Sequence, residues 1–145
     1  TYIGGDIVYG LIADLNKKFA GDNVIFIQID LTRNIIPKTD LMICRDLLFH
    51  LSYDDTKLVL NNFLNSQTNF LLTTTYKQVK GNFFQNRDIF TGAFRMIDLY
   101  SHPYNFPKNP IYCINDWIEP EPERMMCLWS RSQIATAINN FNVFS

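Results

Sequence analysis

Two aspartates each follow a short apolar run near the start of the chain. Asp6 comes directly after residues 2–5, which end in two glycines, and Asp30 comes after the apolar run 24–29. A carboxylate at the end of a buried strand can accept hydrogen bonds from both hydroxyls of an adenosine ribose, and glycine leaves room for the ligand. Asp30 could accept from the adenine amino group. Equally, Asp6 could cap a helix and Asp30 could form an ordinary turn.

A second group of reactive side chains follows later apolar runs. Arg45, Asp46 and His50 come after residues 41–44, and Tyr76 comes after residues 70–75. Aspartate, histidine and tyrosine can each act as a general base in a group-transfer reaction. The alternative is that His50 lies on a helix flank and that Arg45 and Asp46 form a local ion pair, worth under about 1 kcal/mol if exposed.

The elements around these residues predict an α/β fold. Residues 1–5 and Asp6 end a strand, and the apolar residues of 7–19 then follow a helical period. Two short apolar runs, 24–29 and 41–44, are typical of strands buried on both faces, and Ser52 with Asp55 forms a capping box for a helix to about residue 64. With the strand 70–75, this order predicts a Rossmann-like, doubly wound, mostly parallel sheet.

The second half of the chain predicts a long loop and a closing pair of strands. The period is lost over residues 76–110, apart from a possible short helix at 92–99, and aromatic residues accumulate there. They could line a pocket for a small or amphipathic acceptor or form core under the loop. These residues are Phe83, Phe84, Phe90, Phe94, Tyr100 and Tyr104.

Two strand-like runs, 111–117 and 125–129, are joined by a link too short for a crossover helix, so we expect an antiparallel hairpin at a sheet edge, followed by a helix from Ser132.

Composition excludes several classes of protein. The 13 Lys and Arg against 14 Asp and Glu give a net charge of -1, and the scattered basic residues leave no electrostatic footprint for nucleic acid, so that a nucleic-acid partner is disfavoured but not excluded. No apolar run approaches the roughly 20 residues needed to span a bilayer, so we expect no membrane association. Three widely spaced cysteines in apolar runs favour reduced core thiols over a disulfide or a metal site, and the chain contains no glycosylation sequon; a cytoplasmic location follows.

Four segments, in this order and spacing, resemble class I S-adenosylmethionine-dependent methyltransferases. They are residues 2–8 (YIGGDIV), 26–31 (FIQIDL), 40–51 (DLMICRDLLFHL) and 70–76 (FLLTTTY). The resemblance covers residues 1 to about 76 well, and the runs 110–112 and 126–129 are similar to the antiparallel hairpin that closes the sheet in that family.

The resemblance implies S-adenosylmethionine (SAM) as cofactor and a small-molecule methyl acceptor. By position, Asp6 matches the acidic residue that binds the ribose, with Ile7 beside the adenine. Asp30 matches the acid near the adenine amino group, with Leu31 next to it. Cys44 and Arg45 match the segment that lines the methionine end. No fixed catalytic residue is implied; His50, Asp46 or Tyr76 could serve as base.

One part of the family pattern has no counterpart in these residues. The glycine-rich loop after the family's first strand is missing, and that strand lies in the middle of the family's sheet. We therefore expect residues 1–145 to be one partial domain, with roughly 30 residues or more, a strand and its crossover helix, before Thr1. Two other functions stay open. The chain could be a catalytically silent methyltransferase-like scaffold, or a nicotinamide-dependent oxidoreductase, because Asp6 could bind the ribose of a nicotinamide cofactor equally well.

Overall fold

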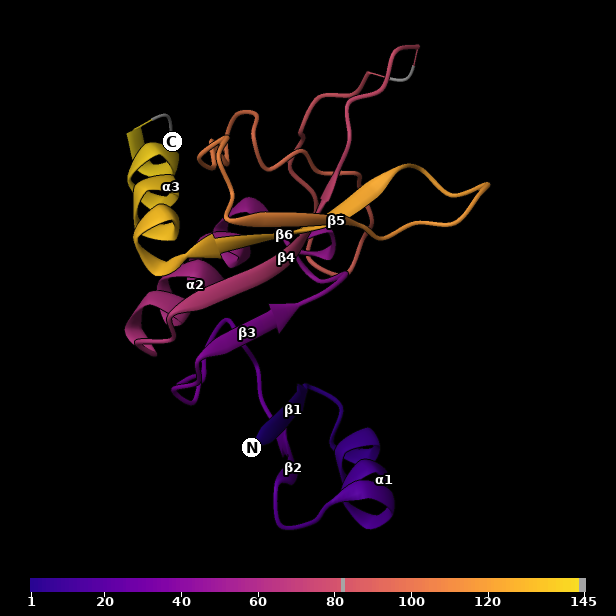
Figure 1. The fold of residues 1–145 in the computed structure, drawn as a ribbon, viewed down its shortest axis with the longest axis vertical. Helices are drawn as coiled ribbons and strands as arrows, with labels where there is room; N and C mark the ends of the chain where they lie inside the picture. Colours follow the sequence, from indigo (N-terminus) through magenta and orange to yellow (C-terminus); the bar gives the residue numbers. More distant parts are fainter. Residues whose placement is uncertain (82, 144–145) are drawn as a thin grey trace.

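The first structural unit is a small parallel sheet with one helix. The computed structural model describes residues 1–81 and 83–143. Strands β1 (Tyr2–Asp6) and β2 (Val24–Gln28) pair in parallel, and helix α1 (Tyr9–Phe19) connects them and packs against both. This unit lies at one end of the molecule, below the other strands in Figure 1.

Local contacts explain why this unit forms. The Asn16 side chain donates to the backbone oxygen of Phe26 at 2.7 Å and accepts from its N–H at 3.1 Å, which ties α1 to β2. Lys17 and Lys18 lie in the last turn of α1, where cations stabilise the helix dipole. A Cβ at Gly4 would lie 2.5 Å from the Phe26 ring, so a larger residue there would force that ring to move.

The second unit is a four-stranded sheet covered by two helices. The strand order is β3-β4-β6-β5, with β3 and β4 parallel and the other two pairs antiparallel. Helix α3 packs against α2 and against strands β4 and β6, and Figure 1 shows both helices beside the sheet. The elements are β3 (Leu41–Cys44), the short 3-10 helix η1 (Leu48–His50), α2 (Tyr53–Asn65), β4 (Phe70–Tyr76), β5 (Tyr112–Asn115), β6 (Arg124–Ser130) and α3 (Arg131–Val143).

Much of the predicted order is confirmed. The Ser52 hydroxyl accepts from the Asp55 N–H at 3.1 Å, as expected of a helix cap, and α2 ends one residue beyond the predicted end. The core lies between this sheet and α2 and α3, with Phe63, Trp129 and Ile134 fully buried. No helix in the described part of the chain is long and apolar enough to cross a bilayer.

The prediction that the strands are buried on both faces is wrong for the first half of the chain. In the described residues only β6 runs antiparallel to the other strands of its sheet, and the strands form two separate sheets. Strands β1 to β3 are largely open to solvent, with Ile43 60% exposed. The chain exposes 8836 Å², whereas about 7,700 Å² is expected for a folded monomer of 17.0 kDa. In the described part of the chain, the groove-side edges of β1 and β3 have no neighbouring strand.

The predicted short helix at residues 92–99 is also absent. Gly92 has a φ of +98°, which interrupts a right-handed helix. The backbone instead runs along η1, where Arg95 N–H donates to the Phe49 carbonyl at 3.2 Å. Of the six aromatic residues in this region, Tyr104 is core, Tyr100 and Phe84 pack against the core, and Phe83, Phe90 and Phe94 are exposed.

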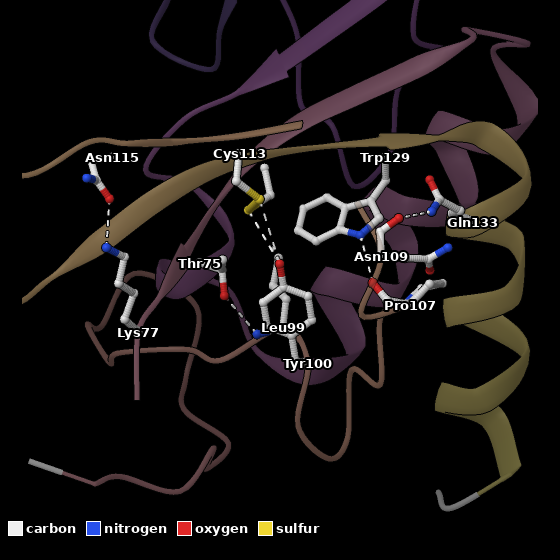
Figure 2. Close-up of a disulfide and its surroundings, with 11 residues drawn as sticks. Thr75, Lys77, Leu99, Tyr100, Pro107, Asn109, Cys113, Asn115, Trp129 and Gln133 are labelled. Carbon is white, nitrogen blue, oxygen red and sulfur yellow. Dashed lines mark hydrogen bonds between the residues drawn. A yellow bond between two sulfur atoms is a disulfide. The ribbon is translucent and has the colours of Figure 1, made fainter. Parts of the chain in front are cut away.

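The cysteine prediction is wrong for two of the three residues. Cys113 and Cys127 stand opposite one another on β5 and β6 and form a disulfide, whereas Cys44 is a buried free thiol as expected. Figure 2 shows the Tyr100 ring turned toward the disulfide, with its hydroxyl 3.5 Å from the Cys127 sulfur. Trp129 lies nearby and donates from Nε1 to the Pro107 carbonyl at 3.2 Å. The pairing could not be read from sequence because it depends on the strand register.

Candidate functional site

A groove of about 520 Å³ separates the two sheets. Its walls are the bodies of two strands, residues 1–5 around β1 and Leu41–Ile43 of β3, together with Ile29 and Leu31. A ligand of an open α/β sheet sits beyond the carboxyl ends of the strands and not between them. The groove therefore has the position of a strand and not that of a cofactor.

Most backbone groups along this groove have no partner in the described chain; the exception is the Leu41 carbonyl, which accepts from the Thr39 hydroxyl at 3.2 Å. Tyr2 N–H donates to Asn23 at 2.7 Å, and the Asp6 carbonyl accepts from Ile29 at 2.9 Å, so the even-numbered residues of β1 face β2. Because backbone groups alternate along a strand, those of Ile3 and Gly5 face the groove. On β3, the Asp40 carbonyl accepts from Phe70 at 3.2 Å, and by the same alternation Leu41 and Ile43 face the groove.

Asp6 lies at the carboxyl end of β1. Its Oδ1 accepts from the Val8 N–H at 2.8 Å, which is the helix-start function considered for it. Oδ2 has no hydrogen-bond partner within residues 1–81 and 83–143. The following residue, Ile7, is an exposed apolar side chain at the same end of β1. One carboxylate oxygen is thus free to accept from a ligand hydroxyl.

Asp30 is occupied locally. Its Oδ1 accepts from the Thr32 N–H at 2.9 Å and from the Thr32 hydroxyl at 2.7 Å, and Arg33 Nε lies 3.6 Å from Oδ2. The hydrogen bonds from Thr32 lower the pKa of Asp30. Leu31 lines the groove, and its carbonyl accepts from the Asn62 side chain at 2.9 Å. Asp30 therefore forms the turn that leads the chain past α2.

Cys44 points away from the strand ends. The thiol is buried in the core, and burial raises its pKa to about 12. The Cys44 carbonyl accepts from the Thr73 hydroxyl at 2.8 Å. A contact of Cys44 with a ligand would have to come from its backbone.

Charged side chains gather beyond the carboxyl ends of β3 and β4. Arg45 pairs with Asp116, Nε to Oδ2 at 2.8 Å, and only weakly with its neighbour Asp46 at 3.9 Å. Asp46 has a φ of +56°, a backbone conformation that aspartate tolerates better than most residues. Its N–H donates to the Thr74 hydroxyl at 2.9 Å, which holds the loop against β4.

Arg124 joins this cluster from β6. It stands opposite Tyr76 in the strand register, and its Nε lies 3.7 Å from Asp46 Oδ1. That Nε is buried and makes no hydrogen bond in the described part of the chain, whereas Nη1 donates to Glu121 at 2.7 Å. Burial raises the pKa of Tyr76, and hydrogen bonding to Arg124 opposes the rise. Tyr76 therefore stays protonated at neutral pH.

Aromatic rings form the other half of this rim. The Phe94 ring is 53% exposed and lies 5.9 Å from the His50 ring and 6.4 Å from the Tyr76 ring, measured between centroids. Phe49 packs beneath them, 4.6 Å from His50 and 5.6 Å from Tyr76. Nδ1 of His50 lies 2.8 Å from the Ala93 carbonyl.

The structure thus brings Arg45, Asp46, His50 and Tyr76 to one rim, while Asp6 and Asp30 lie on the other sheet. Sequence reasoning missed Asp116 and Arg124. Both lie in the hairpin, and only its register places them beside Asp46 and Tyr76. Among residues 1–81 and 83–143, no His, Cys, Asp or Glu side chains cluster as metal ligands.

The chain has no match among known sequence families and none among characterised proteins, but its fold is similar to solved structures. Magnesium protoporphyrin IX methyltransferase from Synechocystis with bound SAH aligns with a TM-score of 0.60 and 14% identity, over 89% of this chain and 63% of that one. A SAM-dependent methyltransferase from Methanosarcina mazei aligns with a TM-score of 0.60 and 11% identity, over 88% and 80%. Human N-acetylserotonin methyltransferase in complex with SAM aligns with a TM-score of 0.57 and 10% identity, over 88% of this chain and 40% of that one.

These likenesses establish the fold, an α/β arrangement shared with SAM-dependent methyltransferases. The chain spans less than two thirds of the Synechocystis protein.

Proposed function

We propose that these residues belong to a SAM-dependent methyltransferase acting on a small-molecule acceptor. The observation that carries the proposal is the free Oδ2 of Asp6 at the carboxyl end of β1, in a fold shared with such enzymes. An acceptor-only oxygen at this point suits the hydroxyls of a nucleoside ribose. When bound, SAM supplies an activated methyl group, and the protein chiefly aligns the acceptor and excludes water.

The six cofactor residues proposed from sequence fit SAM unequally. Asp6 and Ile7 offer a free carboxylate oxygen and an exposed apolar side chain. Asp30 is engaged by Thr32, so its neighbour Leu31 is the better contact for the adenine end. Cys44 offers only its backbone, and Arg45 would have to share its guanidinium with Asp116.

Of the three proposed bases, His50 is the best supported. Asp46 lies between two arginines, 3.9 Å from Arg45 and 3.7 Å from Arg124, so its carboxylate already faces two cationic side chains. Tyr76 is buried and its pKa is raised, so it holds its proton. His50 is half-buried, and Nε2 makes no hydrogen bond in the described part of the chain.

We also propose that one further strand, supplied by chain outside residues 1–145, completes the sheet between β1 and β3. The support is the unpaired backbone of Ile3 and Gly5 on one wall of the groove and of Ile43 on the other, where the Leu41 N–H is also free. Because β1 and β3 both run toward the same edge in Figure 1, a strand parallel to both would bond to each on alternate residues. The 145 residues would then be most of one domain.

A cytoplasmic location stays a prediction. The disulfide between Cys113 and Cys127 weighs against it, because disulfides persist mainly in oxidising compartments.

Calorimetric titration with SAM tests the proposed function. In Asp6→Asn, Oδ1 can still accept from Val8, but an amide donor replaces the free Oδ2. We expect Asp6→Asn to weaken SAM binding about tenfold, the cost of one charge-assisted hydrogen bond. The matched control is Asp14→Asn on the exposed face of α1. Absence of SAM binding, equal loss in both variants, or tighter binding of NADH than of SAM would overturn the proposal.

A further inference from the structure

The segment 88–95 is fixed to the start of α2, although it contains no helix or strand. The Asp88 carboxylate accepts from the Tyr53 N–H at 2.7 Å, and the Thr91 hydroxyl accepts from the Ser52 N–H at 2.9 Å. Gly92 N–H donates to the His50 carbonyl at 2.7 Å. Paired backbone groups of this kind leave little freedom to open, so residues 88–95 form a wall beside His50 and not a mobile lid.

A buried arginine anchors the end of this wall. Arg95 is 3% exposed; Nη1 donates to the Leu51 carbonyl at 2.6 Å and Nη2 to the Tyr104 hydroxyl at 2.5 Å. Its guanidinium also lies 5.2 Å from the centre of the Tyr53 ring, within the range of a cation–π contact. Phe94, the residue before Arg95, is thereby held at a fixed place on the rim.

The wall also fixes which nitrogen of His50 can take a proton. A carbonyl oxygen can only accept, so Nδ1, 2.8 Å from the Ala93 carbonyl, must carry hydrogen. In the neutral ring the lone pair is therefore on Nε2. Phe49 and Phe94 contact the ring at 4.6 and 5.9 Å between centroids and restrict its rotation. His50 is thus held as a base with its orientation set.

Of the four rings that pack together at the rim, only Phe94 is more than half exposed; the other three are Phe49, His50 and Tyr76. Phe94 lies between His50, which can accept a proton, and Tyr76, which holds one. An exposed ring on a rigid backbone offers a face or an edge to another ring at little entropic cost. A flat aromatic molecule on Phe94 would bring a ring substituent within reach of His50.

We infer that the acceptor is a flat aromatic molecule with a hydroxyl group, which packs on Phe94 and gives its proton to Nε2 of His50. The inference rests on the proposed function. The hydroxyl proton passes to Nε2, the oxygen forms a bond to the methyl carbon, and the methyl–sulfur bond breaks with its electron pair left on sulfur. A methyl ether results, and His50 then releases the proton to water.

Binding of two probes tests the acceptor surface without SAM. The probes are 2-naphthol and decahydro-2-naphthol, which have the same carbon skeleton and hydroxyl, but only the first is flat. NMR titration of the complete protein should give a dissociation constant about two- to tenfold lower for 2-naphthol, and Phe94→Leu should remove that preference. The control is Phe90→Leu, because Phe90 lies in the same segment and is 91% exposed.

Transfer of labelled methyl from SAM to 2-naphthol tests the role of His50. In His50→Asn the amide nitrogen can still donate to Ala93, whereas Nε2 is lost. We expect transfer to fall by about 10²-fold or more, with 2-naphthol binding changed much less. Equal binding of the two probes, equal effects of Phe94→Leu and Phe90→Leu, or equal transfer to both probes would overturn the inference. Phe94-dependent naphthol binding without SAM binding would instead keep the aromatic surface and reject the proposed function.

Discussion

Arg45 and Asp116 are 71 positions apart in the sequence and form a two-point ion pair, with Nε to Oδ2 at 2.8 Å and Nη2 to Oδ1 at 3.2 Å. Arg45 follows β3 and Asp116 follows β5, so the pair joins the two outer strands of the four-stranded sheet. Arg124 Nε lies 4.0 Å from Asp116 and links the pair to β6. The loops that form the rim are therefore held to each other at their ends.

We predict that this pair orders the rim more than it stabilises the fold. Arg45 is 54% exposed, so solvent screens the attraction, and the coupling energy should be under about 1 kcal/mol. A double-mutant cycle of Arg45→Gln and Asp116→Asn, measured by urea unfolding at low and high salt, checks this value. A coupling above about 2 kcal/mol that is insensitive to salt would show that the pair is shielded from solvent.

The disulfide should contribute measurably to stability. It closes a loop of 14 residues, for which the chain-entropy account gives about 3 kcal/mol. Reduction, or Cys113→Ser, should lower the free energy of unfolding by about 2–3 kcal/mol in denaturant titrations. Thiol counting in denaturant gives the control: one free thiol, that of Cys44, before reduction and three after it. Three free thiols in the untreated protein would contradict the pairing.

Stability should fall at alkaline pH because of Cys44. Burial raises its pKa from 9.0 to about 12, so above pH 9 the unfolded chain loses a proton that the folded chain keeps. The free energy of unfolding should therefore decrease by up to about 1.4 kcal/mol per pH unit between pH 9 and pH 12. Cys44→Ala should reduce this slope by that amount in urea titrations at pH 8 and pH 10. An unchanged slope would mean that the thiol is not shielded from solvent.

The groove should accept an added strand. The probe is a hexapeptide, Lys-Val-Ile-Val-Ile-Lys, and its control carries prolines in place of both isoleucines, which removes two backbone donors. Hydrogen exchange followed by NMR should show slower exchange at the amides of Ile3, Gly5, Leu41 and Ile43 with the first peptide only. Exchange that stays fast at all four amides would argue against a strand between β1 and β3.

Features set by nearby residues were predictable from sequence. The Ser52 cap, the strand ends at Asp6 and Tyr76, and helix α3 all follow from local side-chain chemistry and periodicity. How far β3 is buried could not be predicted from sequence, because an apolar run shows only that a strand can be buried. Whether Ile43 is covered depends on what packs on its face of the sheet, and in the described part of the chain it is 60% exposed.

Features set by distant contacts escaped prediction. Cys113 and Cys127 become partners only in the register of β5 and β6, and Arg124 meets Tyr76 only in the register of β4 and β6. The helix expected at residues 92–99 is interrupted at Gly92, whose φ is +98°, and the Arg95 side chain instead donates to Leu51 and Tyr104, far from it in sequence. Each of these contacts joins residues whose spacing in the sequence carries no signal.

Mapping SAM on the complete protein by NMR tests the central claim most directly. With amide resonances assigned, saturating SAM should shift the amides at the carboxyl ends of the strands, above all Asp6, Ile7 and Leu31, and leave the far end of α1 at Lys17 unchanged. NADH at the same concentration should produce smaller shifts. The absence of any shift at Asp6 and Ile7 with SAM, or equal shifts with NADH, would contradict a SAM-dependent methyltransferase.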